Sequence, residues 1–140
     1  RLNFEEFKKV EQELQADLEI VQKEYQLMAT QLDSMAKEYE QQSLMLSEDL
    51  KKAKEQDMID MNNSMQSYQL AKLGPNGELT IKQQQLEFQL VEKFKAAVNA
   101  VATAKGVDLI IDGTQASLYT KPTIDLTDDV LTELKKQSTE

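Results

Sequence analysis

The residue types that most enzymes use for acid–base and nucleophilic chemistry do not occur in this sequence. It contains no His and no Cys, so zinc ligation, thiolate chemistry and most general-base schemes lack their usual side chains. Asp and Glu number 25, but no pair of them stands out by position. Asp108 and Asp112 flank an apolar segment, where turn or capping roles are commoner than metal binding. We therefore expect no enzymatic activity, no cofactor and no metal site.

The six methionines have the most distinctive distribution of any residue type, because all of them fall between residues 28 and 65. Flexible, polarisable thioethers suit a surface that accepts many apolar partners. A simpler interpretation is packing between helices, because five of the six recur at helical contact spacing and only Met45 does not. The candidate apolar binding surface comprises Met28, Met35, Leu44, Met45, Leu46, Met58, Met61 and Met65.

The charge balance narrows the classes of partner. The formal net charge is -9, with 16 Lys and Arg against 25 acids, whereas nucleic-acid binding depends on clustered basic residues. No run of about 18 apolar residues is present that could span a membrane. The chain begins at Arg1 without an initiating Met, and we interpret it as a mature or trimmed chain whose signal peptide has been removed.

The elements that carry the methionines are predicted to be long helices. Apolar residues recur at alternating spacings of three and four from Phe7 to Leu46, interrupted by the polar residues Asp17 and Gln42. This heptad repeat is typical of a coiled coil. A less regular repeat follows over residues 50–68, so we expect two helices that pack along a shared seam.

Two positions could reverse the direction of the chain. A turn at Gly74–Gly77 would set about 70 residues against about 27, or about 100 Å of helix against about 40 Å. A turn at residues 46–49 balances the two arms, and Ser47 can cap the new helix there. We therefore predict a helical hairpin over residues 5–105, with its tip near 46–49 and a kink or loop at 73–79.

The last third of the sequence changes from a helical to a strand-like pattern. Gly106 is well placed to end the preceding helix. Val107–Asp112 is rich in strand-forming residues, and after the turn residues 113–115 a second strand is expected over residues 116–120. Thr127 is expected to cap a final amphipathic helix.

Two short strands and one short helix cannot bury their apolar faces alone, so we expect copies of the chain to assemble through residues 106–140. Residues 1–4 would add the end of a further strand. The predicted fold class is α+β, mostly α: a long antiparallel coiled-coil hairpin attached to a small β-body with a C-terminal helix. The residues expected in this assembly body are Leu109, Ile110, Ile111, Leu118, Tyr119, Val130, Leu131 and Leu134.

Four segments occur in a characteristic order in the last third: Phe94–Ala102, Val107–Asp112, Ala116–Tyr119 and Ile124–Leu131. Their order and spacing resemble those of the Skp/OmpH-like periplasmic chaperones. The resemblance implies a homotrimer in which strands from three chains build the β-body and three helical hairpins, the tentacles, surround a central cavity. It also implies an ATP-independent holdase that keeps unfolded outer-membrane proteins in this cavity within the periplasm.

Two features depart from that family. Acids outnumber lysines over residues 37–60, which disfavours attraction to lipopolysaccharide or to an anionic membrane surface, and the interruption at 73–77 looks like an insertion. A different function also fits a coiled coil, namely a structural adaptor that links components of the cell envelope through its tips. A cytosolic prefoldin-like holdase is disfavoured, because prefoldin subunits carry their strands between the helices and here both predicted strands follow them.

Overall fold

The computed structural model describes residues 5–138 of the 140-residue chain. Its elements in chain order are α1 (Glu5–Gln42), α2 (Glu48–Leu73), α3 (Glu78–Lys105), α4 (Gly113–Ala116), the short 3₁₀ helix η1 (Pro122–Ile124) and α5 (Thr127–Gln137). They form two compact units, here called the hairpin unit, residues 11–84, and the body unit, residues 5–10 with 85–138. The boundary between the units falls within α1 and within α3.

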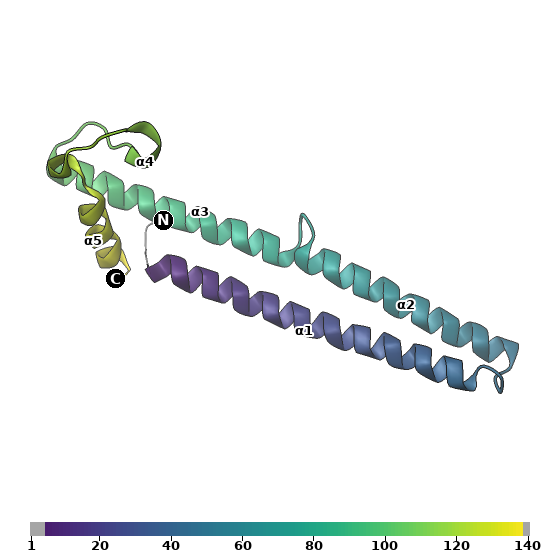
Figure 1. Cartoon of the computed structure of the whole chain (residues 1–140). Helices are drawn as coiled ribbons and strands as arrows, with labels where there is room; N and C mark the ends of the chain where they lie inside the picture. Colours follow the sequence, from purple (N-terminus) through teal and green to yellow (C-terminus); the bar gives the residue numbers. More distant parts are fainter. Residues whose placement is uncertain (1–4, 139–140) are drawn as a thin grey trace. The chain divides into compact units, whose positions relative to one another are not determined.

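The hairpin unit consists of two antiparallel helical arms. α1 forms one arm, and α2 with the start of α3 returns along it (Figure 1). At the turn between them, the Ser47 hydroxyl accepts a hydrogen bond from the backbone N–H of Leu50 at 3.3 Å. Glu48 and Asp49 occupy the first turn of α2, where acidic side chains complement the positive end of the helix dipole. The predicted long helical hairpin and the predicted cap at Ser47 are both confirmed.

The two arms pack along a narrow apolar seam. Val21 of α1 and Met65 of α2 are its most covered members, with exposed fractions of 5% and 7%. Each is surrounded along its own helix by half-buried residues at heptad positions, as expected for knobs that fit between the side chains of the opposite arm. These half-buried residues are Tyr25, Met28, Leu32, Met35, Tyr39, Met58, Met61 and Tyr68.

Polar contacts between the arms show how the hairpin accommodates residues 74–77. The Tyr68 hydroxyl donates to the Glu24 carboxylate, and the Lys82 ammonium donates to the Asp17 carboxylate. Between these two pairs the returning arm advances 14 residues, from 68 to 82, while α1 moves only seven, from 24 to 17. The extra residues are looped out of the returning arm, and α1 stays continuous opposite them.

The loop at residues 74–77 is closed by backbone hydrogen bonds. The Gly74 N–H donates to the Leu70 carbonyl at 2.9 Å, and the Gly77 N–H donates to the Gly74 carbonyl at 2.8 Å. The Gly77 carbonyl in turn accepts from the Ile81 N–H at 2.9 Å and starts the ladder of α3. A Cβ on Gly77 would lie 2.7 Å from the Gly74 nitrogen and 2.8 Å from the Lys72 carbonyl, so only glycine fits this turn.

The body unit has a small core between α3 and α5. At its centre Ala97 is completely buried, and its small side chain allows the two helices to approach closely. An ion pair between Lys105 and Asp129, with 3.6 Å between the Lys105 Nζ and the Asp129 Oδ1, joins the same helices at the surface. The core comprises Leu90, Ala97, Val101, Val130 and Leu134, with Val10, Val98 and Leu126 packed against it.

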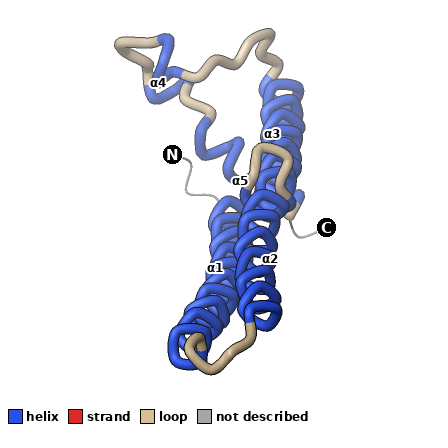
Figure 2. The backbone as a smooth tube through the Cα atoms, turned by 90° about the vertical axis from the view of Figure 1, so that its right-hand side faces the viewer, coloured by secondary structure: helices blue, strands red, loops and turns tan. Residues whose placement is uncertain are grey.

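The predicted β-hairpin at residues 107–120 is wrong for this chain, because no strand occurs anywhere in residues 5–138 (Figure 2). The residues expected to form its turn instead start α4, where the Asp112 carboxylate accepts from the Thr114 N–H at 2.9 Å. Strand propensity also requires a backbone edge with which to pair, and this segment has none within the chain described. The strand expected at residues 1–4 lies outside the described residues.

The ends of the later helices confirm one prediction and correct another. Gly106 adopts a left-handed φ of 66° after α3, and the Val107 N–H bonds back to the Ala102 carbonyl at 3.1 Å, as in a Schellman C-cap. The final helix was predicted to be capped by Thr127, but Thr127 is its first residue. The Asp125 carboxylate accepts from both the N–H of Thr127, at 3.0 Å, and its hydroxyl, at 2.6 Å, because a carboxylate two positions earlier reaches both donors.

Candidate functional site

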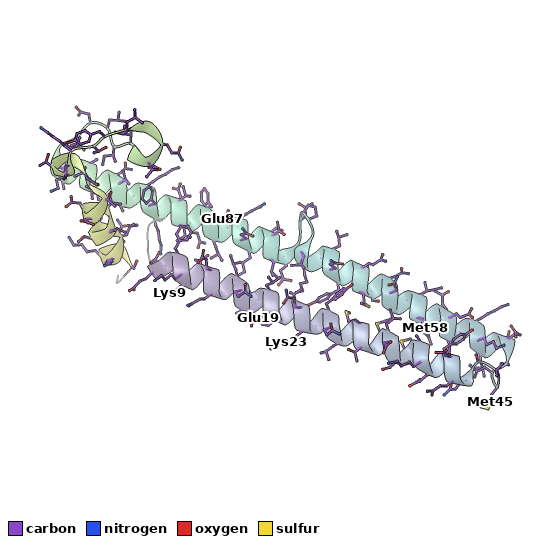
Figure 3. The ribbon with its side chains drawn as sticks, viewed as in Figure 1. Lys9, Glu19, Lys23, Met45, Met58 and Glu87 are labelled. Carbon is purple, nitrogen blue, oxygen red and sulfur yellow. The ribbon has the colours of Figure 1, made fainter. Side chains whose placement is uncertain are left out.

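The candidate apolar surface divides into covered and exposed residues. Met65 is buried, and its thioether therefore packs between the arms and cannot meet a partner. The exposed fractions of Leu44 and Met45, in contrast, are 98% and 82%. Both belong to the turn between α1 and α2, where Figure 3 shows Met45 at the end of the hairpin and Met58 on α2. The half-buried members are Met28, Met35, Leu46, Met58 and Met61.

The sequence interpretation that the methionines pack in the seam therefore describes five of the six. Only Met45 presents its side chain to solvent, together with Leu44 and, at the start of α2, Leu50, which is 54% exposed. We call these three residues the apolar tip. A neighbouring ion pair, Lys51 with Glu48 at 3.1 Å, makes the rim of the apolar tip polar.

Sequence reasoning missed a second set of exposed apolar side chains in the hairpin unit. They lie outside the heptad seam and are separated from one another by charged and amide residues. The signal that could have found them is an apolar residue at a non-seam heptad position, because the seam leaves that face of the helix in water. They are Ile20 at 55%, Leu27 at 70%, Ile59 at 53% and Leu70 at 65% exposure.

Hydrogen bonds between the arms hold the hairpin that carries these residues. The Tyr39 hydroxyl donates to Glu55, and the Tyr68 hydroxyl donates to Glu24. Burial of its hydroxyl, together with the hydrogen bond to Glu24, raises the pKa of Tyr68 to about 12. Tyr68 therefore stays neutral and keeps donating its proton throughout the neutral pH range.

The eight residues expected in the assembly body also fall into two groups. Val130 and Leu134 belong to the core between α3 and α5, and Ile110 and Leu131 are half-buried. The remainder lie between α3 and η1 and are exposed, with fractions of 78% for Leu109, 60% for Ile111 and 78% for Tyr119, and with Leu118 fully exposed. The body unit further exposes Phe88 at 66%, Val91 at 49% and Phe94 at 40%.

A shallow groove lies between the start of α1 and α3 in the body unit. Within it the Lys93 ammonium pairs with the Glu6 carboxylate at 2.9 Å. Burial raises the pKa of Glu6, but hydrogen bonds from Ser138 and Lys93 outweigh this effect and leave the pKa lowered. The groove is lined by Glu6, Lys9, Val10, Leu86, Gln89, Leu90 and Lys93. Glu6 and Lys93 neutralise each other within the groove, and Lys9 adds a further positive charge to its lining.

Within residues 5–138, no group of three or more Asp or Glu is arranged to hold a metal ion. None of the described helices combines the length and the apolar content needed to cross a membrane.

Comparison with known families identifies the fold. The family model for outer membrane protein (OmpH-like) matches residues 2–134. The chain belongs to the OmpH-like family. The resemblance to Skp/OmpH-like proteins, first indicated by four segments in the last third of the sequence, is therefore confirmed, and the OmpH-like match also includes the whole hairpin unit.

A solved structure has the same OmpH-like fold. It is the 2.83 Å crystal structure of a Caulobacter crescentus CB15 protein that carries the description of an outer membrane chaperone (OmpH-like). The TM-score is 0.84 and the sequence identity is 19%, with 93% of this chain and 75% of that chain covered. At this identity the comparison establishes the shared fold. A comparison with curated protein sequences finds no match.

Proposed function

We propose that this OmpH-like chain is an ATP-independent holdase chaperone of the periplasm, which binds unfolded outer-membrane proteins and prevents their aggregation. The observation that carries the proposal is the set of separate, exposed apolar side chains on the hairpin unit of an OmpH-like chain. Leu27 and Leu70 are each more than half exposed along the arms, and Leu44 and Met45 are almost fully exposed at the turn.

This arrangement suits an unfolded barrel protein as client. The strands of such a protein alternate apolar and polar residues, so an extended client offers many small apolar contacts rather than one large group. Separate apolar points on a polar helix match that pattern, and many weak contacts add up through multivalency while each is easily released. The acidic hairpin also keeps the empty chaperone soluble.

The body unit supports a homotrimer. Leu109, Ile111, Leu118 and Tyr119 are large apolar side chains that the single chain leaves in water, and a concentration of exposed apolar residues in one segment is expected where copies of a chain assemble. Assembly through residues 106–140 would cover them. Three hairpin units would then enclose a common cavity for the client.

Dilution of a urea-unfolded outer-membrane β-barrel protein tests the function directly. Stoichiometric chaperone should suppress light scattering without ATP, and multi-angle scattering should give the mass of a trimer. A double variant, Leu44→Ser with Met45→Gln, should weaken suppression, while exposed polar replacements on the two arms, Gln41→Ser with Lys52→Gln, should not. A monomer that leaves aggregation unchanged would refute the proposal.

The apolar tip also favours a second candidate, a structural adaptor of the cell envelope. Leu44, Met45 and Leu50 are exposed apolar residues at and beside the turn of the hairpin, and a pocket of a single folded partner would accept such side chains. Immobilised protein would then retain one folded envelope protein at a fixed ratio and would not suppress aggregation of unfolded barrels. The scattering and retention assays therefore separate the two functions.

A further inference from the structure

Met45 differs from the other methionines in its access to small reagents. Its side chain is 82% exposed, whereas Met65 is 7% exposed and buried in the seam. Met28, Met35, Met58 and Met61 are half-buried between the arms. Met45 also lies in the turn, residues 43–47, outside any helix, so no neighbouring helix covers its sulfur.

We propose that Met45 is the preferred oxidation site of this chain, and that its conversion to methionine sulfoxide adds a polar group to the apolar tip. Two observations carry the two parts of the proposal. The exposure of Met45 makes it the preferred site, and its position between Leu44 and Leu46 places the change among apolar residues. Thioether oxidation follows exposure and turns a flexible apolar side chain into a polar, chiral one.

The oxidant class is hydrogen peroxide. A sulfur lone pair of Met45 attacks one peroxide oxygen, the S–O bond forms and the O–O bond breaks. The departing hydroxide takes the proton from the oxygen that is now bound to sulfur and leaves as water. The sulfur thereby loses two electrons, and the peroxide gains two. A neutral oxidant suits the site, because the nearby Glu48 and Asp49 repel anionic ones. The sulfoxide is reversible by a methionine sulfoxide reductase.

The consequence for clients rests on the proposed chaperone function. In that role Met45 gives an extended client an apolar contact at the turn of the hairpin. A sulfoxide oxygen there prefers water to an apolar side chain, so oxidation weakens that contact. The seam methionines keep the hairpin folded meanwhile, because their thioethers remain covered.

Peptide mapping after limited peroxide treatment of the full chain tests the site. Trypsin cleavage after Lys37 and Lys51 yields a peptide, residues 38–51, that contains Met45 as its one methionine. Met28 and Met35 fall in peptide 24–37, and the other three fall in peptide 55–72. Met45 should oxidise at least about tenfold faster than Met65 in the folded chain.

The urea-unfolded chain is the internal control. There the six methionines should oxidise at rates within about twofold of one another, because exposure no longer distinguishes them. The site is overturned if any seam methionine of the folded chain oxidises as fast as Met45. It is equally overturned if the difference in rate persists after unfolding.

Two variants test the consequence for clients separately. The affinity of the wild type for an unfolded outer-membrane β-barrel protein should fall about three- to tenfold after peroxide treatment. Met45→Leu should keep its affinity after treatment, and Met45→Gln should start low and stay low. Unchanged wild-type affinity after selective oxidation overturns the effect on clients. Untreated protein that binds no client refutes the chaperone function, while the oxidation site is still judged by the peptide rates.

Discussion

The Lys82 Nζ lies 2.6 Å from Asp17 Oδ2 and 2.6 Å from Glu13 Oε1 across the two arms of the hairpin unit. Hydrogen bonds to the two carboxylates, with that to Asp17 the stronger, raise the pKa of Lys82. Asp17 is the residue that interrupts the apolar heptad of α1, and its partner follows the looped-out residues 74–77. The polar interruption thus selects the register in which α3 resumes along α1, a role that polar seam residues have in coiled coils.

Replacement of Lys82 by Gln should lower the free energy of unfolding, because the Asp17 and Glu13 carboxylates lose their shared cation. Urea unfolding followed by circular dichroism measures the change. Lys37→Gln is the matched control, since Lys37 pairs with Asp33 at 2.6 Å but within one helix and largely in solvent. Lys37→Gln should lower the free energy of unfolding clearly less than Lys82→Gln does. Equal effects would mean that the contact between the arms has no special role.

Gly77→Ala should destabilise the hairpin unit by about 1–3 kcal/mol, because the new methyl group would meet backbone atoms 2.7 to 2.8 Å away and the loop must open to admit it. Thermal unfolding reports the loss. Gly113→Ala is the control, because its Cβ would be 3.6 Å from the Thr120 hydroxyl, an ordinary contact. That variant should be neutral or slightly stabilising. Equal changes in thermal stability for the two variants would contradict the close packing around Gly77.

Ala97→Leu should displace α5 from α3. Ala97 is fully buried, so three added carbon atoms overpack the core at a cost of about 1–3 kcal/mol. Hydrogen exchange should show faster exchange of the amides of α5, Thr127–Gln137. The adjacent Ala96 is exposed, and Ala96→Leu should leave that exchange rate unchanged. Slow exchange in both variants would place the core elsewhere.

The stability of the hairpin unit should fall as the pH rises from 10 to about 12. The pKa of Tyr68 is raised from 10.0 to about 12 in the folded chain, so above pH 10 the unfolded chain loses this proton first. The folded state then binds more protons, and the free energy of unfolding decreases with pH. Below pH 10 the contribution is fully present.

Tyr68→Phe isolates this contribution, because lysines with raised pKa values lose their protons in the same alkaline range. Chemical unfolding at pH 9 and at pH 12 should show a smaller alkaline loss for Tyr68→Phe than for the wild type. An identical loss in both proteins would show that the hydrogen bond from Tyr68 to Glu24 adds nothing to stability.

The order of the helices could be predicted because their signals are local. The heptad repeat specifies which face of α1 is covered, Ser47 marks the start of α2 and Gly106 marks the end of α3. Helix hydrogen bonds join residues four apart, and caps act within three or four residues. These signals are read directly along the chain, whatever packs against it.

The strands predicted at residues 107–112 and 116–120 failed because a strand depends on a partner distant in sequence. Propensity in Val107–Asp112 is real, but pairing requires a backbone edge, and here Asp112 starts α4 instead. Asp112 was expected to have a turn or capping role, and its carboxylate caps the start of α4. Whether such a segment forms a strand or a short helix depends on its packing partners, which the pattern of residues in the segment does not specify.

The sequence by itself determined the helical arms, because heptad spacing and caps are short-range properties of neighbouring residues, and it indicated the family through the order of four segments in its last third. Only the tertiary structure decided which side chains are available to a partner. It covers Met65 and leaves Met45 in solvent, and it brings Lys82 to Asp17 across 65 positions of sequence. Exposure and pairing between the arms depend on how two distant helices are aligned, and that alignment results from the packing of the whole seam.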